Sequence, residues 1–68
     1  MSTFKERLLE EKEQLDERLT KLMLFQQSDA FDGIAPIQMT ILNIQANAMA
    51  TYSQCLLERL AWLGPETK

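Results

Sequence analysis

The sequence predicts an all-α protein, in which an antiparallel hairpin of two helices assembles into a homo-oligomeric helical bundle. Good helix formers fill two long segments, at about 4–27 and 36–63, and turn-forming residues gather in the connector 28–35. A chain of 68 residues makes one domain, 1–68, whose core is too small to be stable without a disulfide, a metal or a partner chain. One cysteine cannot close an intrachain disulfide, and a chain without histidine lacks a common zinc ligand. The sequence therefore favours self-association.

The first segment is typical of a helix with one narrow apolar side. Thr3-Phe4-Lys5-Glu6 matches a capping box, which marks a helix start. The apolar side consists of Phe4, Leu8, Leu15, Leu19 and Leu22. These residues fall within an arc of about 60°, which is wide enough to contact one neighbouring helix. The remaining surface is charged, and Lys12–Asp16 and Glu17–Lys21 have the spacing of i,i+4 ion pairs.

The connector separates the helices with turn residues. Asp32-Gly33 is a turn signal, and Pro36 suits the first turn of the second helix because it has no N–H to leave unpaired. We expect Phe25 and Phe31 to fold back and cover this end of the hairpin. Gly64-Pro65 predicts the end of the second helix.

The second segment has an apolar side too broad for the first helix to cover. At 100° per residue its apolar arc spans about 220°, and uncovered apolar surface of this extent is unusual on a monomer. We therefore predict that copies of the chain associate through this helix. The residues expected at the oligomer interface are Ile41, Leu42, Ile44, Ala48, Met49, Leu56, Leu60 and Leu63.

A polar stripe interrupts the apolar arc at intervals of seven residues. It consists of Gln38, Gln45, Tyr52 and Arg59. Buried polar groups are costly unless they are hydrogen-bonded, so one interpretation is that the stripe bonds across subunits and fixes their register. The other is that it lines an intersubunit ligand site, with Tyr52 stacking on a base and Arg59 contacting an anion. Arg18, Lys12 and Lys21 of a neighbouring chain are candidate second cations for such a site.

Composition and spacing argue against several functional classes. Seven Lys and Arg against ten Asp and Glu give a net charge of −3, which disfavours general binding to DNA. Cys55 has no histidine or second cysteine to activate it, so we expect a small core residue. No metal-ligand or catalytic spacing is visible, and we expect no enzyme, metal or cofactor. Residues 1–6 are too polar for a signal peptide, and the amides of the second helix argue against a membrane span, which leaves the cytoplasm.

Three stretches of the chain resemble small helical proteins encoded by tailed phages and prophages. They are the acidic, leucine-rich run 8–22, the pattern Phe25-x-x-Ser28-x-x-Phe31, and the pattern Ile44-Gln45-x-x-x-Met49-x-x-Tyr52-x-x-x-Leu56-x-x-Arg59. The resemblance covers nearly the whole chain. It implies a small protein that acts in the cytoplasm of a bacterial host.

A narrower resemblance concerns the anti-CBASS cyclic-nucleotide sponges of phages. Ile44-Gln45-Ala46-Asn47-Ala48-Met49 is similar to a Leu-Gln-x-x-x-Met stretch in the second helix of that family. The resemblance implies a compact helical oligomer that sequesters cyclic oligonucleotides between subunits. The tyrosine and lysine that contact the ligand in that family have no clear counterpart here. Helical-hairpin dimers of the Rop type, which bind paired RNA loops, are similar in length and layout, but the first helix here is net acidic.

The sequence is compatible with two functions. The favoured one is non-catalytic anti-defence binding, in which the oligomer sequesters a cyclic nucleotide or similar anionic signal between subunits. The alternative is a structural or protein–protein interaction module that inhibits or adapts a host protein and holds no small molecule.

Overall fold

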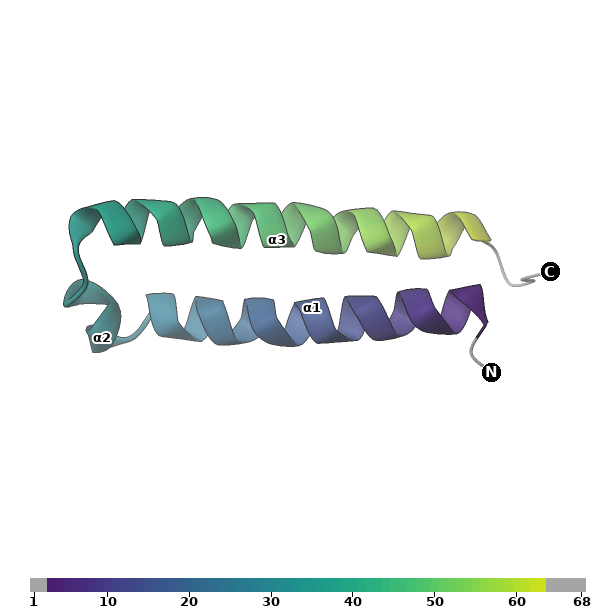
Figure 1. Cartoon of the computed structure of the whole chain (residues 1–68), viewed down its shortest axis with the longest axis horizontal. Coiled ribbons are helices and arrows are strands. Elements are labelled where there is room, and N and C mark those ends of the chain that lie inside the picture. The colour runs from purple at the N-terminus through teal and green to yellow at the C-terminus, as the bar shows by residue number, and fades with distance from the viewer. Residues whose placement is uncertain (1–2, 64–68) are drawn as a thin grey trace.

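The computed structural model describes residues 3–63 and contains three helices. They are α1 (Phe4–Gln26), α2 (Asp29–Asp32) and α3 (Pro36–Leu63). α1 and α3 lie side by side and run in opposite directions, with α2 at the turn between them (Figure 1). The described residues contain no strand, so the predicted all-α class is confirmed. The radius of gyration, 15.4 Å, exceeds the value of about 11 Å expected for a compact domain of this length, because the chain forms one elongated layer.

The start of α1 has the capping box that the sequence predicts. Thr3 Oγ1 accepts a hydrogen bond from the Glu6 backbone N–H at 3.0 Å. In return, Glu6 Oε1 accepts one from the Thr3 backbone N–H at 2.8 Å. Two N–H groups that an α-helix leaves unpaired at its start are thereby satisfied.

The connector contains a helical turn that the sequence analysis did not anticipate. α2 spans only four residues, and the Ser28 hydroxyl before it donates to the Phe25 carbonyl at 2.6 Å. The rings of Phe25 and Phe31 meet edge to face, with centroids 5.9 Å apart, as expected for two aromatic residues that close this end. α3 begins at Pro36. The predicted stop at Gly64-Pro65 lies outside the described residues.

The two long helices contact each other through matched heptad spacing. On α1 the contacting positions are Leu8, Lys12, Leu15, Leu19, Leu22 and Gln26, all buried or partly buried. On α3 they are Met39, Leu42, Ala46, Met49, Ser53, Leu56, Leu60 and Leu63. Both sets alternate steps of three and four residues, the spacing that keeps one side of a helix against a neighbour. The buried centre consists of Leu8, Leu15 and Leu56, of which Leu56 is fully buried.

This contact corrects part of the predicted oligomer interface. Leu56 is 0% exposed within the single chain, so no surface of this residue is left for a second copy. Met49, Leu60 and Leu63 pack against the same intrachain cluster, and Leu42 is also partly buried. The broad apolar arc predicted for the second helix combines two surfaces, one that contacts α1 and one that faces away from it. Periodicity alone does not say which side of α3 faces α1.

A polar cluster fixes the alignment of α1 against α3. Lys12 Nζ donates to Asp16 Oδ2 at 2.6 Å and to Ser53 Oγ at 3.2 Å. The Ser53 hydroxyl donates to Asp16 Oδ1 at 2.5 Å. These bonds lower the pKa of the Asp16 carboxyl below its ordinary value, with the Lys12 bond as the largest cause. Because Ser53 takes a heptad position opposite Lys12, a sliding of α3 by one turn would break the two bonds made by Ser53 and leave the Lys12–Asp16 bond within α1 intact.

The central leucine gives the first test. Leu56→Ala removes a fully buried side chain, and we expect it to lower the free energy of unfolding by about 2–5 kcal/mol. Leu57→Ala is the matched control, since the neighbouring side chain is 48% exposed and should cost far less. Urea unfolding followed by circular dichroism, at one protein concentration, measures both. Equal losses in the two variants would contradict the assigned core.

The polar cluster gives a pH-dependent test. The folded-state pKa of Asp16 is lowered, so its contribution to stability is present above the unfolded value of about 3.9 and is lost as the pH falls through the folded value. Asp16→Asn should therefore lower the urea midpoint at pH 7, and the gap to the unsubstituted protein should close on acidification. Glu17→Gln removes the exposed Lys21–Glu17 pair, 3.4 Å apart, and should change the midpoint little at either pH. A gap for Asp16→Asn that persists unchanged at pH 3 would be inconsistent with this assignment.

Candidate functional site

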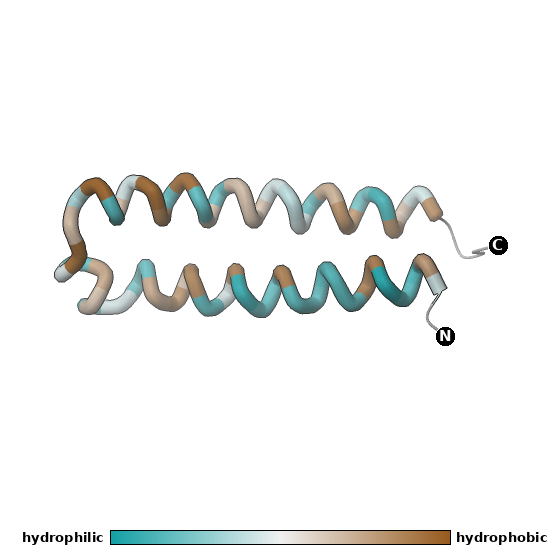
Figure 2. The backbone as a smooth tube through the Cα atoms, in the orientation of Figure 1, coloured by the Kyte–Doolittle hydropathy of each residue, from teal (hydrophilic) through white to brown (hydrophobic). Residues whose placement is uncertain are grey.

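The side of α3 that faces away from α1 carries a second heptad pattern. We call it the outer face, and its residues are Ile37, Ile41, Ile44, Ala48, Thr51, Cys55, Glu58 and Trp62. They too alternate steps of four and three, and their mean direction is about 150° from that of the residues contacting α1. Ile37 is 63% exposed, Ile44 62% and Trp62 86%. Figure 2 shows hydrophobic segments on this side of α3 near its N-terminal end, whereas α1 is hydrophobic chiefly where it faces α3.

Cys55 belongs to this outer face, which corrects the expectation that it is a core residue. Its side chain is exposed in the single chain because it lies one residue before Leu56, and adjacent residues of a helix point about 100° apart. Ile41, Ile44 and Ala48, which the sequence analysis placed at the oligomer interface, are exposed on the same face.

The polar stripe Gln38, Gln45, Tyr52 and Arg59 runs along one edge of the outer face. Each member directly follows an outer-face residue, and all four are exposed. Successive members are about 10.5 Å apart along the helix. Within residues 3–63 no hydrogen bond joins the stripe to α1, and the link between them is the Arg59 guanidinium, whose Cζ lies 5.8 Å from the centroid of the Phe4 ring.

The Phe4 contact identifies which side of α1 adjoins the stripe. Arg7 and Arg18 follow Phe4 by three and fourteen residues, so their directions lie within about 60° of its own. The three arginines of the chain therefore share the side of the molecule that carries the stripe. Glu11, seven residues after Phe4, is an acidic group on the same side.

Arg18 is also level with the middle of the stripe. The bond from Lys12 to Ser53 and the bond from Gln26 to Asn43 align the two helices on either side of Arg18. Arg18 lies on the part of α1 between Lys12 and Gln26. The part of α3 that faces it lies between Asn43 and Ser53 and contains Gln45 and Tyr52. The sequence analysis singled out Arg18 but missed Arg7, whose position three residues after Phe4 was the available signal.

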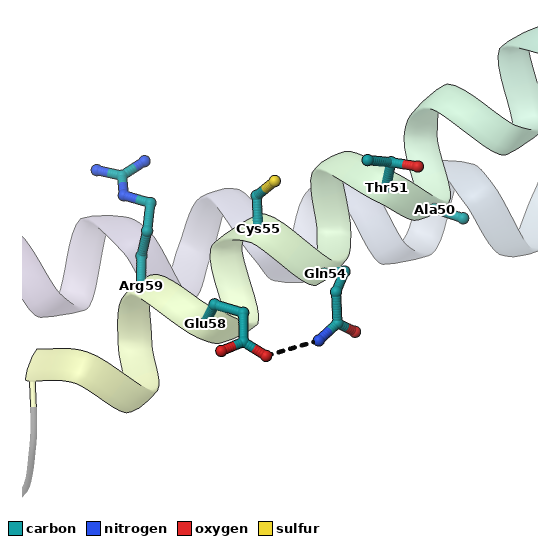
Figure 3. A pocket seen from close by; sticks show the side chains of 6 residues that line it. All are labelled: Ala50, Thr51, Gln54, Cys55, Glu58 and Arg59. Atoms are coloured by element: carbon teal, nitrogen blue, oxygen red, sulfur yellow. Dashed lines mark hydrogen bonds between the residues drawn. The ribbon is translucent and has the colours of Figure 1, made fainter.

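A shallow hollow lies beside Arg59 on α3 (Figure 3). It is lined by Ala50, Thr51, Gln54, Cys55, Glu58 and Arg59. Gln54 Nε2 donates to Glu58 Oε2 at 2.9 Å, and this pair points away from the side to which Arg59 and Cys55 point. Because one helix supplies the whole lining, the hollow is open to solvent and cannot enclose a ligand by itself.

A second hollow, unforeseen by the sequence analysis, lies between the helices. Its lining is Leu19, Met23, Gln26, Asn43, Ala46, Asn47 and Ala50. Gln26 Nε2 donates to Asn43 Oδ1 at 2.7 Å across it. The lining is uncharged, so this hollow offers neutral hydrogen bonds and apolar contact but no ion pair. The stripe is therefore the better candidate for an anion.

Residues 3–63 contain no cluster of three or more His, Cys, Asp or Glu side chains placed to hold a metal ion. None of the helices in that range combines the length and apolar character needed to cross a bilayer.

Comparison with known proteins places the chain in a family. No curated protein and no solved structure matches it significantly. A family model described as Sequestin matches residues 2–61, and the name indicates a sequestering or binding role. Since the match spans both long helices and the connector, the chain belongs to the Sequestin family.

Proposed function

We propose that this protein is a non-catalytic, phage-type anti-defence protein that sequesters a cyclic nucleotide or a similar anionic signal between the subunits of a homo-oligomer. The site comprises the polar stripe together with Arg18. The protein acts in the cytoplasm of a bacterial host, and its partners are other copies of the same chain and the captured ligand. Membership of the Sequestin family supports the binding role.

The observation that carries the proposal is that all three arginines share the side of the molecule that carries Tyr52 and the rest of the polar stripe. A guanidinium donates two parallel hydrogen bonds to phosphate oxygens, which makes arginine the preferred phosphate ligand. An exposed tyrosine offers an aromatic surface on which a base stacks, a contact worth about 1–3 kcal/mol per base. The amides of Gln38 and Gln45 each provide a donor and an acceptor for a base edge or a ribose. Phosphate, base and sugar chemistry therefore lie together on one side of the molecule.

The net charge of −3 does not oppose this function. Residues 4–21 hold most of the charge, five positive and six negative side chains, whereas Glu58 and Arg59 are the charged residues of α3. At an ionic strength of 0.15 M charges are screened over about 8 Å, so an anion at the stripe responds to nearby groups more than to the whole chain. The nearby groups are Arg7, Arg18, Arg59 and Glu11.

A second copy of the chain is needed to complete the site. On one chain the stripe is exposed, and water competes for every hydrogen bond. Binding sites for small molecules are concave and bury most of the ligand. The uncovered outer face beside the stripe has the composition of a helix–helix contact, and a copy docked there supplies the missing wall.

The alternative function is a protein–protein interaction module for a host protein. The outer face supports it, because an exposed apolar helix side of this length also suits the groove of another protein. In that case the stripe forms the polar rim of a protein interface, and no small ligand is bound.

Ligand binding separates the two functions. Isothermal calorimetry with a panel of cyclic di- and trinucleotides should detect binding by the unsubstituted protein. Arg18→Gln should weaken it tenfold or more, since a hydrogen bond to a charged group is worth about 1.5–3 kcal/mol. Tyr52→Leu should also weaken it through the loss of stacking.

The matched control is Lys5→Gln, which removes a cation from the opposite side of α1 and should leave the affinity unchanged. Light scattering on each variant checks that the oligomeric state is preserved. If no cyclic nucleotide binds, or if Lys5→Gln weakens binding as much as Arg18→Gln, the sequestering proposal fails.

A further inference from the structure

The spacing of the outer-face residues along α3 is the same when read from either end of the helix. Its eight residues form a closed set of four pairs when the helix is set against an antiparallel copy of itself. The pairs are Ile37 with Trp62, Ile41 with Glu58, Ile44 with Cys55, and Ala48 with Thr51. The two-fold axis of this arrangement passes between Ala48 and Thr51, where small side chains allow the helices to approach closely.

We propose that a second copy of the chain docks antiparallel on the outer face in this register, and that the dimer thereby gathers both polar stripes on one side. The inference deepens the proposed function and rests on it for the identity of the ligand. It specifies which residues of the two copies face each other, and it therefore has a test that needs no ligand.

Charge favours the antiparallel arrangement over a parallel one. In a parallel pair each residue of the outer face meets its own counterpart, so Glu58 would lie against Glu58. In the antiparallel pair the two Glu58 side chains are separated by most of the length of α3. The hydrogen bond from Gln54 also holds the carboxylate toward the edge opposite the stripe, away from Ile41 of the second copy.

Side-chain size points the same way. A parallel pair would place Ala48, Thr51 and Cys55 against themselves in three consecutive layers and Trp62 against Trp62 in the last. Small pairs leave voids and large pairs are overpacked, and both reduce stability. The antiparallel register sets Cys55 against Ile44 and Trp62 against Ile37, so each of these layers pairs a smaller side chain with a larger one.

The acidic character of the chain does not prevent this association. Glu58 is the one charged residue of the outer face. In the dimer the two α1 helices lie outermost, separated by three helix–helix distances, or about 24–30 Å. This separation exceeds the screening length of about 8 Å, so the charges of α1 repel each other weakly.

The consequence for the site follows from the position of the stripe. Each stripe residue comes one position after an outer-face residue, and in an antiparallel pair equivalent edges meet on the same side. Gln45 of one copy then lies two helix positions, or about 3 Å, from the level of Tyr52 of the other, and Gln38 lies at the same offset from Arg59. The result is a two-fold symmetric groove, which suits an anion that is itself two-fold symmetric, with two phosphates and two bases.

The native cysteine provides the test. In the proposed register the two Cys55 residues are eleven helix positions apart, or about 16 Å, whereas a disulfide requires Cα atoms within about 7 Å. The unsubstituted protein should therefore stay uncrosslinked under mild oxidation. Ile44→Cys places a thiol opposite Cys55 of the second copy, and this variant should form a covalent dimer with a 44–55 disulfide. Non-reducing electrophoresis and peptide mass spectrometry measure the product.

Two controls make the result specific. Ile44→Cys combined with Cys55→Ser should not crosslink, because the two introduced cysteines are again about 16 Å apart. A link between positions 44 and 55 of the same helix is excluded by the same distance. Since Ile44 is 62% exposed in the single chain, its substitution should leave α1 and α3 packed, and circular dichroism checks this.

Three results would overturn the proposal. They are a Cys55–Cys55 disulfide in the unsubstituted protein, no 44–55 disulfide in a folded oligomer of the Ile44→Cys variant, and a monomer by sedimentation at all concentrations. Each is independent of nucleotide binding. A 44–55 disulfide without nucleotide binding would uphold the dimer and reject the sequestering function.

Discussion

The contact between α1 and α3 determines which side of each long helix is buried and which is exposed. Both helices present apolar residues at alternating steps of three and four, and Leu8, Leu15 and Leu56 are buried where they meet. Such spacing lets a helix keep one side against a neighbour over its whole length. Once α3 has turned Leu56 inward, the residues half a turn away are forced outward, and the outer face and the polar stripe follow from this choice.

The small core explains why the outer face matters. Within residues 3–63 the layer of two long helices has no third element that covers the far side of α3, and the exposed isoleucines and Trp62 are the result. A chain of this size gains much of its stability from a partner when it lacks disulfides and metal sites. In the proposed dimer, a ligand site beside the uncovered face would couple assembly to binding, because the second copy that covers the apolar residues would also close the groove beside the stripe.

Two sets of polar residues have different roles in this arrangement. Ser53 of α3 bonds to the Lys12–Asp16 pair of α1, and these bonds align the helices. The stripe makes no hydrogen bond to α1 within residues 3–63, so alignment inside the chain does not require it. Its four members are left exposed for contacts outside the chain, with Arg59 already stacked on Phe4.

The sequence by itself determined the helical class, the capping box at Thr3, the contact of Phe25 with Phe31 and the i,i+4 pairs of α1, because these depend on neighbours within a few positions. It also identified the stripe from its seven-residue spacing. Only the tertiary structure decided which part of the apolar arc of α3 is core, since that depends on where α1 packs. The packing of α1 against α3 buries Leu56, leaves Cys55 exposed and pairs Ser53 with Lys12. It also places Arg18 on the same side of the molecule as Tyr52. Helical periodicity fixes the angles between residues on one helix, but the side that faces a neighbour is set by the packing of two helices together.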